Sequence, residues 1–77
     1  MKFKIQEKVI NIVTGKKCII VGTKEKAYQP TNMISNQEEI MPDKGYDYLI
    51  MSKNENINKQ REYSGLTSAM EGYLNKI

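Results

Sequence analysis

The sequence predicts a mainly β domain of five strands, with a long middle loop and a short helical turn near the C-terminus. Its 77 residues make a single domain, residues 1–77. β-Branched Ile and Val are frequent, whereas alanine occurs only at Ala27 and Ala69, and this balance favours strands over long helices. Residues 7–23 have the pattern of a hairpin, and residues 46–51 form an aromatic and aliphatic run. These three observations predict the fold class.

The first hairpin is expected within residues 7–23. Residues 7–13 and 17–23 are rich in β-branched side chains, and the short turn between them contains Gly15, which can take a positive φ at no steric cost. Two such runs around a short glycine-containing turn are typical of a β-hairpin. Gly22, near the end of the second run, indicates a bulge or the close approach of another backbone segment.

A second hairpin is expected around the turn at residues 42–45. Pro42 fixes φ there, and Gly45 can adopt the left-handed conformation. The brief run at residues 39–41 would pair with residues 46–51, which are the best candidate for a central strand.

Two further segments complete the predicted strand order. Residues 24–38 are polar and form a long loop, which is functional, mobile or the site of a short additional strand. Residues 59–63 are expected to be a return strand that ends at Ser64 and Gly65.

The C-terminal tail allows two readings. Its apolar residues recur at helical spacing, and Ser68 with Glu71 fits a capping box. Gly72 opposes a long helix. We therefore expect a helical turn over residues 67–72 followed by a final strand, and the alternative is an α+β fold with a helix over residues 67–76.

The residue types required for common catalytic chemistry are missing. The chain has no histidine and one cysteine, which removes histidine-based triads and cysteine-based zinc sites. Cys18 follows a lysine and precedes three β-branched residues, so we expect it to pack as a small apolar side chain. No glycine-rich phosphate-binding motif occurs. We therefore predict a non-enzymatic protein with no catalytic residue, cofactor or metal.

Charge is unevenly distributed along the chain, whose net charge is +3. Residues 1–26 carry seven lysines and two glutamates, whereas residues 27–50 are net acidic. A basic first third can attract phosphate, and it can equally be a solvated lysine-rich surface. No run approaches the ~20 apolar residues of a membrane span, and the start lacks the apolar stretch of a signal peptide. We expect a soluble, cytoplasmic protein that does not bind membranes.

The first part of the sequence resembles the opening of a small Src-homology-type barrel, as in KOW, Tudor-like and several small bacterial families. The resemblance rests on Phe3, the Lys8-Val9 pair, the turn around Gly15 and the run Cys18-Ile19-Ile20-Val21-Gly22. It implies a closed five-stranded β-barrel that binds peptides, methylated side chains or nucleic acid along an aromatic-lined groove.

The sequence departs from that family pattern in two places. Many members have Gly-Asp before the first valine, where this chain has Gln6-Glu7, and many have a glycine where this chain has Cys18. The resemblance covers residues 3–22, and more loosely residues 46–51 and 74–77.

The first functional hypothesis is a protein-interaction or adaptor module. The long loop contains apolar residues that need either a core or a partner, and aromatic side chains outside a core favour partner contact. Tyr46 and Tyr48 would share one strand face, either as core residues or as a flat binding platform. The candidate partner-binding residues are Tyr28, Met33, Ile34, Tyr46 and Tyr48.

Two other hypotheses remain open. In the second, lysines track a phosphate backbone while tyrosine or Arg61 stacks on bases. Its candidate residues are Lys16, Lys17, Lys24, Lys26 and Arg61. Acidic side chains of residues 27–50 would repel the same backbone if they shared that face. In the third hypothesis, the protein is a structural homodimer formed through an open sheet edge.

Overall fold

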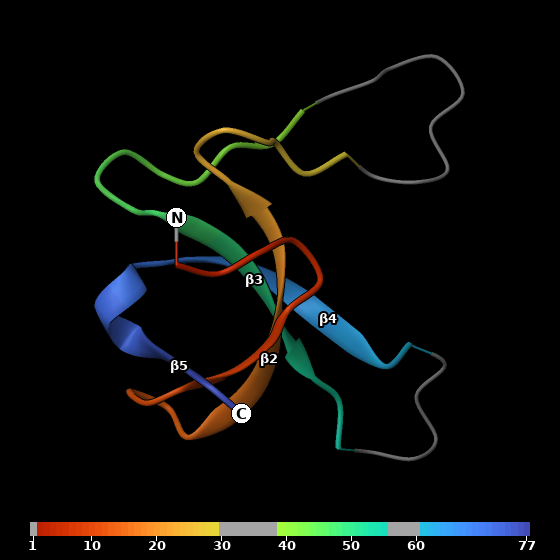
Figure 1. Ribbon diagram of the computed structural model, residues 1–77. Helices are drawn as coiled ribbons and strands as arrows, with labels where there is room; N and C mark the ends of the chain where they lie inside the picture. The colour runs from red at the N-terminus through yellow and green to blue at the C-terminus, as the bar shows by residue number, and fades with distance from the viewer. Residues whose placement is uncertain (1, 30–38, 56–60) are drawn as a thin grey trace.

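The computed structural model describes residues 2–29, 39–55 and 61–77. These residues form one antiparallel sheet of five strands and a single 3₁₀ turn, so the predicted mainly β class is confirmed (Figure 1). The elements are β1 (Lys8–Asn11), β2 (Lys16–Thr23), β3 (Tyr48–Lys53), β4 (Tyr63–Ala69), the 3₁₀ turn η1 (Glu71–Tyr73) and β5 (Leu74–Lys76). Within the described ranges, no helix has the length and apolar character needed to cross a membrane.

The strands lie in the order β4-β3-β2-β1-β5, so the last strand of the chain pairs with the first. β4 and β5 are the two edges, and they lie on opposite sides of β2 and β3 in Figure 1. No ladder joins these edges among the described residues, so the closed barrel is not confirmed. β3 lies between β2 and β4, as expected for a central strand.

The first predicted hairpin is confirmed. β1 and β2 pair antiparallel, from Asn11 opposite Lys16 outward. The turn lies at residues 12–15, whereas residues 14–16 were expected. The amide of Gly15 donates to the carbonyl of Asn11 (2.7 Å), and Gly15 has a φ of 77°. The Asn11 side chain accepts a second bond from the amide of Val13 (2.9 Å), so an Asx-type contact starts the turn.

The second predicted hairpin is wrong in its pairing. The turn itself forms, because the amide of Tyr46 donates to the carbonyl of Asp43 (2.9 Å) and Gly45 has a φ of 91°. Ile40, however, makes an isolated antiparallel bridge with Tyr28 instead of pairing with β3. Both long edges of β3 are already taken by β2 and β4, so no edge is left for residues 39–41.

The C-terminal predictions need two corrections. The expected return strand does not end at Gly65: β4 continues to Ala69, and Gly65, with a φ of 81°, lies at a register shift inside it. The alternative helix over residues 67–76 is wrong, because the end of β4, η1 and β5 occupy that segment. The helical turn expected over residues 67–72 is the shorter 3₁₀ turn Glu71–Tyr73. Ser68 does not cap a helix, since its hydroxyl accepts the amide of Asp43 (2.9 Å). The expected final strand is β5.

The core lies on one face of the curled sheet. Its buried members come from every strand and from the N-terminal segment: Phe3, Val9, Cys18, Ile20, Tyr48, Ile50, Ala69 and Leu74. The rings of Phe3 and Tyr48 meet edge to face, with centroids 5.6 Å apart. The Tyr48 hydroxyl accepts the amide of Phe3 (3.1 Å) and donates to the carboxylate of Glu71 (2.8 Å). An aromatic with a satisfied polar end therefore links the chain start to η1.

Gln6 is the non-glycine residue with a positive φ among the described residues, and its φ is 71°. The amide of Glu7 donates to the carbonyl of Lys4 (3.0 Å), which closes a tight turn with Gln6 at its third position. Gln6 and Glu7 both bond to Ile20, through its carbonyl (2.7 Å) and its amide (3.0 Å). Two residues opposite one define a β-bulge whose first position is left-handed and normally glycine. Gln6 adopts this left-handed position although it is not glycine.

Candidate functional site

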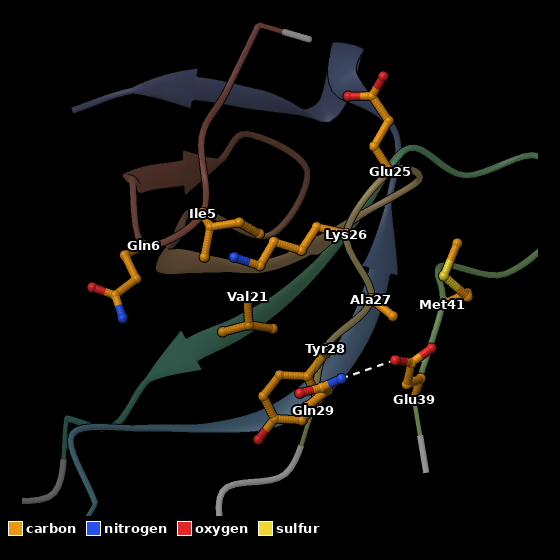
Figure 2. Close-up of a pocket in the computed structure, with 10 residues that line it drawn as sticks. All are labelled: Ile5, Gln6, Val21, Glu25, Lys26, Ala27, Tyr28, Gln29, Glu39 and Met41. Atoms are coloured by element: carbon orange, nitrogen blue, oxygen red, sulfur yellow. Dashed lines mark hydrogen bonds between the residues drawn. The ribbon is translucent and has the colours of Figure 1, made fainter. Parts of the chain in front are cut away.

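An open hollow of about 530 Å³ lies where the end of β2 meets the segments on either side of the long loop (Figure 2). We call it the apolar hollow. It is lined by Ile5, Gln6, Val21, Glu25, Lys26, Ala27, Tyr28, Gln29, Glu39 and Met41.

A tight reversal after β2 carries the chain back over the sheet. The Thr23 hydroxyl accepts the amides of Glu25 (3.1 Å) and Lys26 (3.0 Å), and the amide of Thr23 donates to the carbonyl of Lys26 (2.8 Å). Three bonds around one residue hold this reversal. The following residues, Ala27 and Tyr28, consequently form one wall of the apolar hollow.

Gly22 permits the close approach of this returning segment. A Cβ atom at Gly22 would lie 3.2 Å from the amide nitrogen of Tyr28 and 3.2 Å from Cδ1 of Leu49. The β2–β3 register also shifts between Ile20 and Gly22. Both readings of this glycine, a bulge and a close backbone approach, are confirmed.

The two walls of the hollow are joined by backbone and side-chain bonds. Tyr28 and Ile40 exchange two backbone hydrogen bonds of 2.9 Å each. Next to them, the side-chain amide of Gln29 donates to the carboxylate of Glu39 (2.9 Å), as the dashed line in Figure 2 shows. In the described part of the long loop, this bridge is the sole sign of the short additional strand; residues 30–38 lie outside the described residues.

The hollow combines apolar walls with a charged rim. Met41 is 48% exposed at its mouth, and Tyr28 and Val21 are half-buried. Methionine is flexible and polarizable, so it adapts to apolar side chains of different shapes. Lys26 and Glu39 are exposed on the rim and can form hydrogen bonds to the backbone of a bound segment. This arrangement can accept one or two apolar side chains of an extended segment.

The structure separates the predicted partner-binding residues. Tyr28 lines the apolar hollow. Tyr48 is fully buried in the core, and burial raises the pKa of its phenol, so its ring is structural. Tyr46 is half-buried and precedes β3, so the two tyrosines form no common platform. Met33 and Ile34 lie outside the described residues.

The predicted nucleic-acid residues are not brought together into one patch. Lys16 and Lys17 are exposed at the start of β2 and, as neighbours in a strand, face opposite sides of the sheet. Lys24 pairs with Asp47 (3.0 Å), and Lys26 is on the rim of the apolar hollow. Arg61 is exposed beside the end of β3, where its carbonyl accepts the side-chain amide of Asn54 (2.7 Å).

Asp47 is the acidic residue most clearly affected by its surroundings. The backbone amide of Glu71 donates to it (2.8 Å) and Lys24 forms an ion pair with it, and in this order they lower the pKa of its carboxyl. One carboxylate thereby holds η1 to the start of β3. Its role in the structure is that of a connector.

A second, polar hollow of about 450 Å³ opens at the other end of the sheet. It is lined by Lys16, Ser52, Lys53, Asn54, Glu55, Ser64, Gly65 and Thr67. Sequence reasoning named Lys16 but missed Lys53, because only the pairing of β2 with β3 brings them together. Met41 was missed for a similar reason: it was assigned to a strand pairing that does not form.

No group of three or more potential metal-ligating side chains occurs within residues 2–29, 39–55 and 61–77. In comparisons with protein-family models, curated proteins and solved structures, the chain has no significant match.

Proposed function

We propose that the protein is a non-enzymatic interaction module that binds an extended segment of a partner protein in the apolar hollow. The observation that carries this proposal is the pairing of an exposed methionine, Met41, with the half-buried Tyr28 and Val21 around one open depression. Apolar side chains gathered in a concave surface with a polar rim are typical of the centre of a protein interface.

The size and openness of the hollow favour a side chain of a larger partner over an enclosed small ligand. A depression of about 530 Å³ is within the range of ligand sites, but this one lacks a lid among the described residues that line it. Its walls are fixed by the Tyr28–Ile40 bridge. A preformed wall lowers the entropy lost on binding.

We propose further that the curled sheet is a small Src-homology-type barrel. The neighbouring first and last strands support this, because they bring both chain ends into one sheet, as a barrel of that type requires. The left-handed Gln6 in the family's glycine position is a second supporting feature. Fold alone fixes no partner, and the hollow remains the argument for function. The protein is expected to act in the cytoplasm.

The test is selection of peptides on the wild-type protein from a displayed random library, followed by titration of the enriched peptides. Met41→Glu places a charge in the hollow and should weaken binding about tenfold or more, the loss expected at an interface anchor. Met70→Glu is the matched control, since Met70 is 40% exposed but lies at the end of β4, outside the lining of the hollow.

The control should bind within about twofold of the wild type. Library selection that enriches no peptide, or peptides whose affinity falls equally in both variants, would contradict the proposal.

A further inference from the structure

The five strands contain five lysines and no acidic residue. The lysines are Lys8, Lys16, Lys17, Lys53 and Lys76. The described acidic side chains lie outside the strands: Glu7 precedes β1, and the others are in the connections between strands. A sheet whose only charges are positive concentrates potential of one sign on its surface, and the strand pairing decides which lysines share a face.

Alternation assigns three of these lysines to the outer face. Val9, Cys18 and Ile20 point into the core, so the residues between and beside them on β1 and β2 point outward. On β3 the core residues are Tyr48 and Ile50, which directs Leu49, Met51 and Lys53 by alternation to the outer face. The pairing of Met51 with the outward Ile19 agrees with this assignment.

The register arranges the outer face in two rows. The first row crosses β1, β2 and β3 as Lys8, Ile19 and Met51. Leu66 of β4 lies beside this row, at the register shift between Ile50 and Ser52. We call Ile19, Met51 and Leu66 the apolar row; all three are half-buried.

The second row carries the charge. Ile10 pairs with Lys17, and Lys53 pairs with Tyr63. Cys18 pairs with Ser52, so one step further along both strands places Lys17 opposite Lys53. We call Lys17, Lys53 and Tyr63 the cationic row. Residues two apart on a strand are about 7 Å apart, which sets the spacing between the two rows.

Like charges directly opposite each other destabilise a sheet. Lys17 and Lys53 are both exposed, and the ion pairs of the described residues are Lys24–Asp47 and Lys76–Glu7, neither of which involves them. The sheet therefore keeps an electrostatic repulsion that a single acidic substitution on either strand would remove. An anionic ligand would relieve it.

We propose that this outer face binds single-stranded nucleic acid, with phosphates on the cationic row and base faces on the apolar row and Tyr63. A nucleotide joins an anionic group to a flat apolar base, which matches a lysine row beside an apolar row. Proteins that bind single strands combine basic groups that follow the backbone with aromatic side chains on which bases stack, and Tyr63 provides the aromatic ring here. A second copy of the chain, docked symmetrically through the same face, fits poorly because it would bring Lys17 and Lys53 close to the same lysines of the other copy.

The test is fluorescence anisotropy with labelled oligothymidine and oligouridine of about 15 nucleotides. The wild type is titrated between about 50 and 200 mM salt, where phosphate contacts lose affinity steeply. The double variant Lys17→Gln/Lys53→Gln should bind at least about tenfold more weakly, and its salt slope should fall by about 1.4, or ~0.7 for each lost contact. Tyr63→Leu should weaken binding about fivefold or more through lost stacking.

The matched control is Lys4→Gln/Lys44→Gln, which removes the same charge from exposed lysines that lie outside the strands. It should bind within about twofold of the wild type. Unchanged thermal unfolding of both double variants shows that the fold is intact. A wild type that binds no oligonucleotide at low salt, equal losses in the two double variants, or binding to polyglutamate or anionic vesicles with no oligonucleotide binding would overturn the proposal.

Discussion

Replacement of Gln6 by glycine is expected to stabilise the protein. Gln6 has a φ of 71° at the first position of a bulge, where its backbone bonds to Ile20. In this left-handed conformation the Cβ of an L-residue crowds its own backbone, whereas glycine has no Cβ. The Gln6 side chain is exposed, so its removal costs little packing.

The expected gain follows from two opposing effects. The left-handed conformation costs about 1–2 kcal/mol for an ordinary residue, and glycine removes this cost. Glycine also has more conformational freedom in the unfolded chain, which offsets about 0.5–1 kcal/mol of this gain in stability. The net stabilisation should be about 0.5–1 kcal/mol, which for a domain of this size raises the melting temperature by roughly 2–8 °C.

Thermal and urea unfolding of the wild type, Gln6→Gly and Gln6→Ala measures the effect. The alanine variant is the matched control, because it removes the same side chain but retains Cβ, and it should stay close to the wild type. A glycine variant that melts at or below the wild-type temperature would refute the reasoning, as would an alanine variant that gains as much as the glycine variant.

Three further outcomes are expected. Gly22→Ala should lose about 1–3 kcal/mol of unfolding free energy by overpacking, because its Cβ would press on the bonded amide of Tyr28; unfolding in urea that matches the wild type would contradict this. Tyr48→Phe leaves the buried amide of Phe3 without its acceptor and should lose about 1–3 kcal/mol, measured in the same way. In the folded protein the amide of Glu71 in η1 and the side chain of Lys24 lower the pKa of Asp47. The ionised carboxyl therefore stabilises the fold at pH values above its ordinary pKa, and this contribution is lost as pH falls through the pKa of the folded state. Asp47→Asn should therefore lower the melting temperature at neutral pH and progressively less below about pH 4; a constant difference at every pH would exclude this linkage.

Local sequence signals predicted the turns and most of the strands. The hairpin of β1 and β2 was predictable because β-branched runs flank Gly15, and the interior position of β3 was predictable from its apolar character. The burial of Cys18 was predictable from its apolar neighbours. Each of these features depends on residues close together in the chain.

The errors arose where pairing over long distances decided the outcome. Residues 39–41 looked like a partner for β3, but Ile40 bridges Tyr28 because β2 and β4 already flank β3. Gly65 looked like a strand end, but in the sheet it is accommodated at a bulge of β4. Tertiary context overrides local propensity in such cases.

The candidate sites were predicted only in part. Tyr28 was identified from its setting in a polar loop, and it lines the apolar hollow. Lys17 was identified as one of the lysines of the basic first third. Their neighbours, Met41 and Lys53, come from distant segments and had no local signal that linked them to either surface.

The sequence by itself determined that this is a small β-rich chain with glycine-containing turns near Gly15 and Gly45 and a basic first third. It also showed that the chain has no histidine and one cysteine. Only the tertiary structure decided which face each strand residue occupies, because a shift of one residue in register moves every side chain to the opposite face. That choice buries Tyr48, opens the apolar hollow beside Tyr28, and sets Lys17 opposite Lys53 on a sheet without carboxylates.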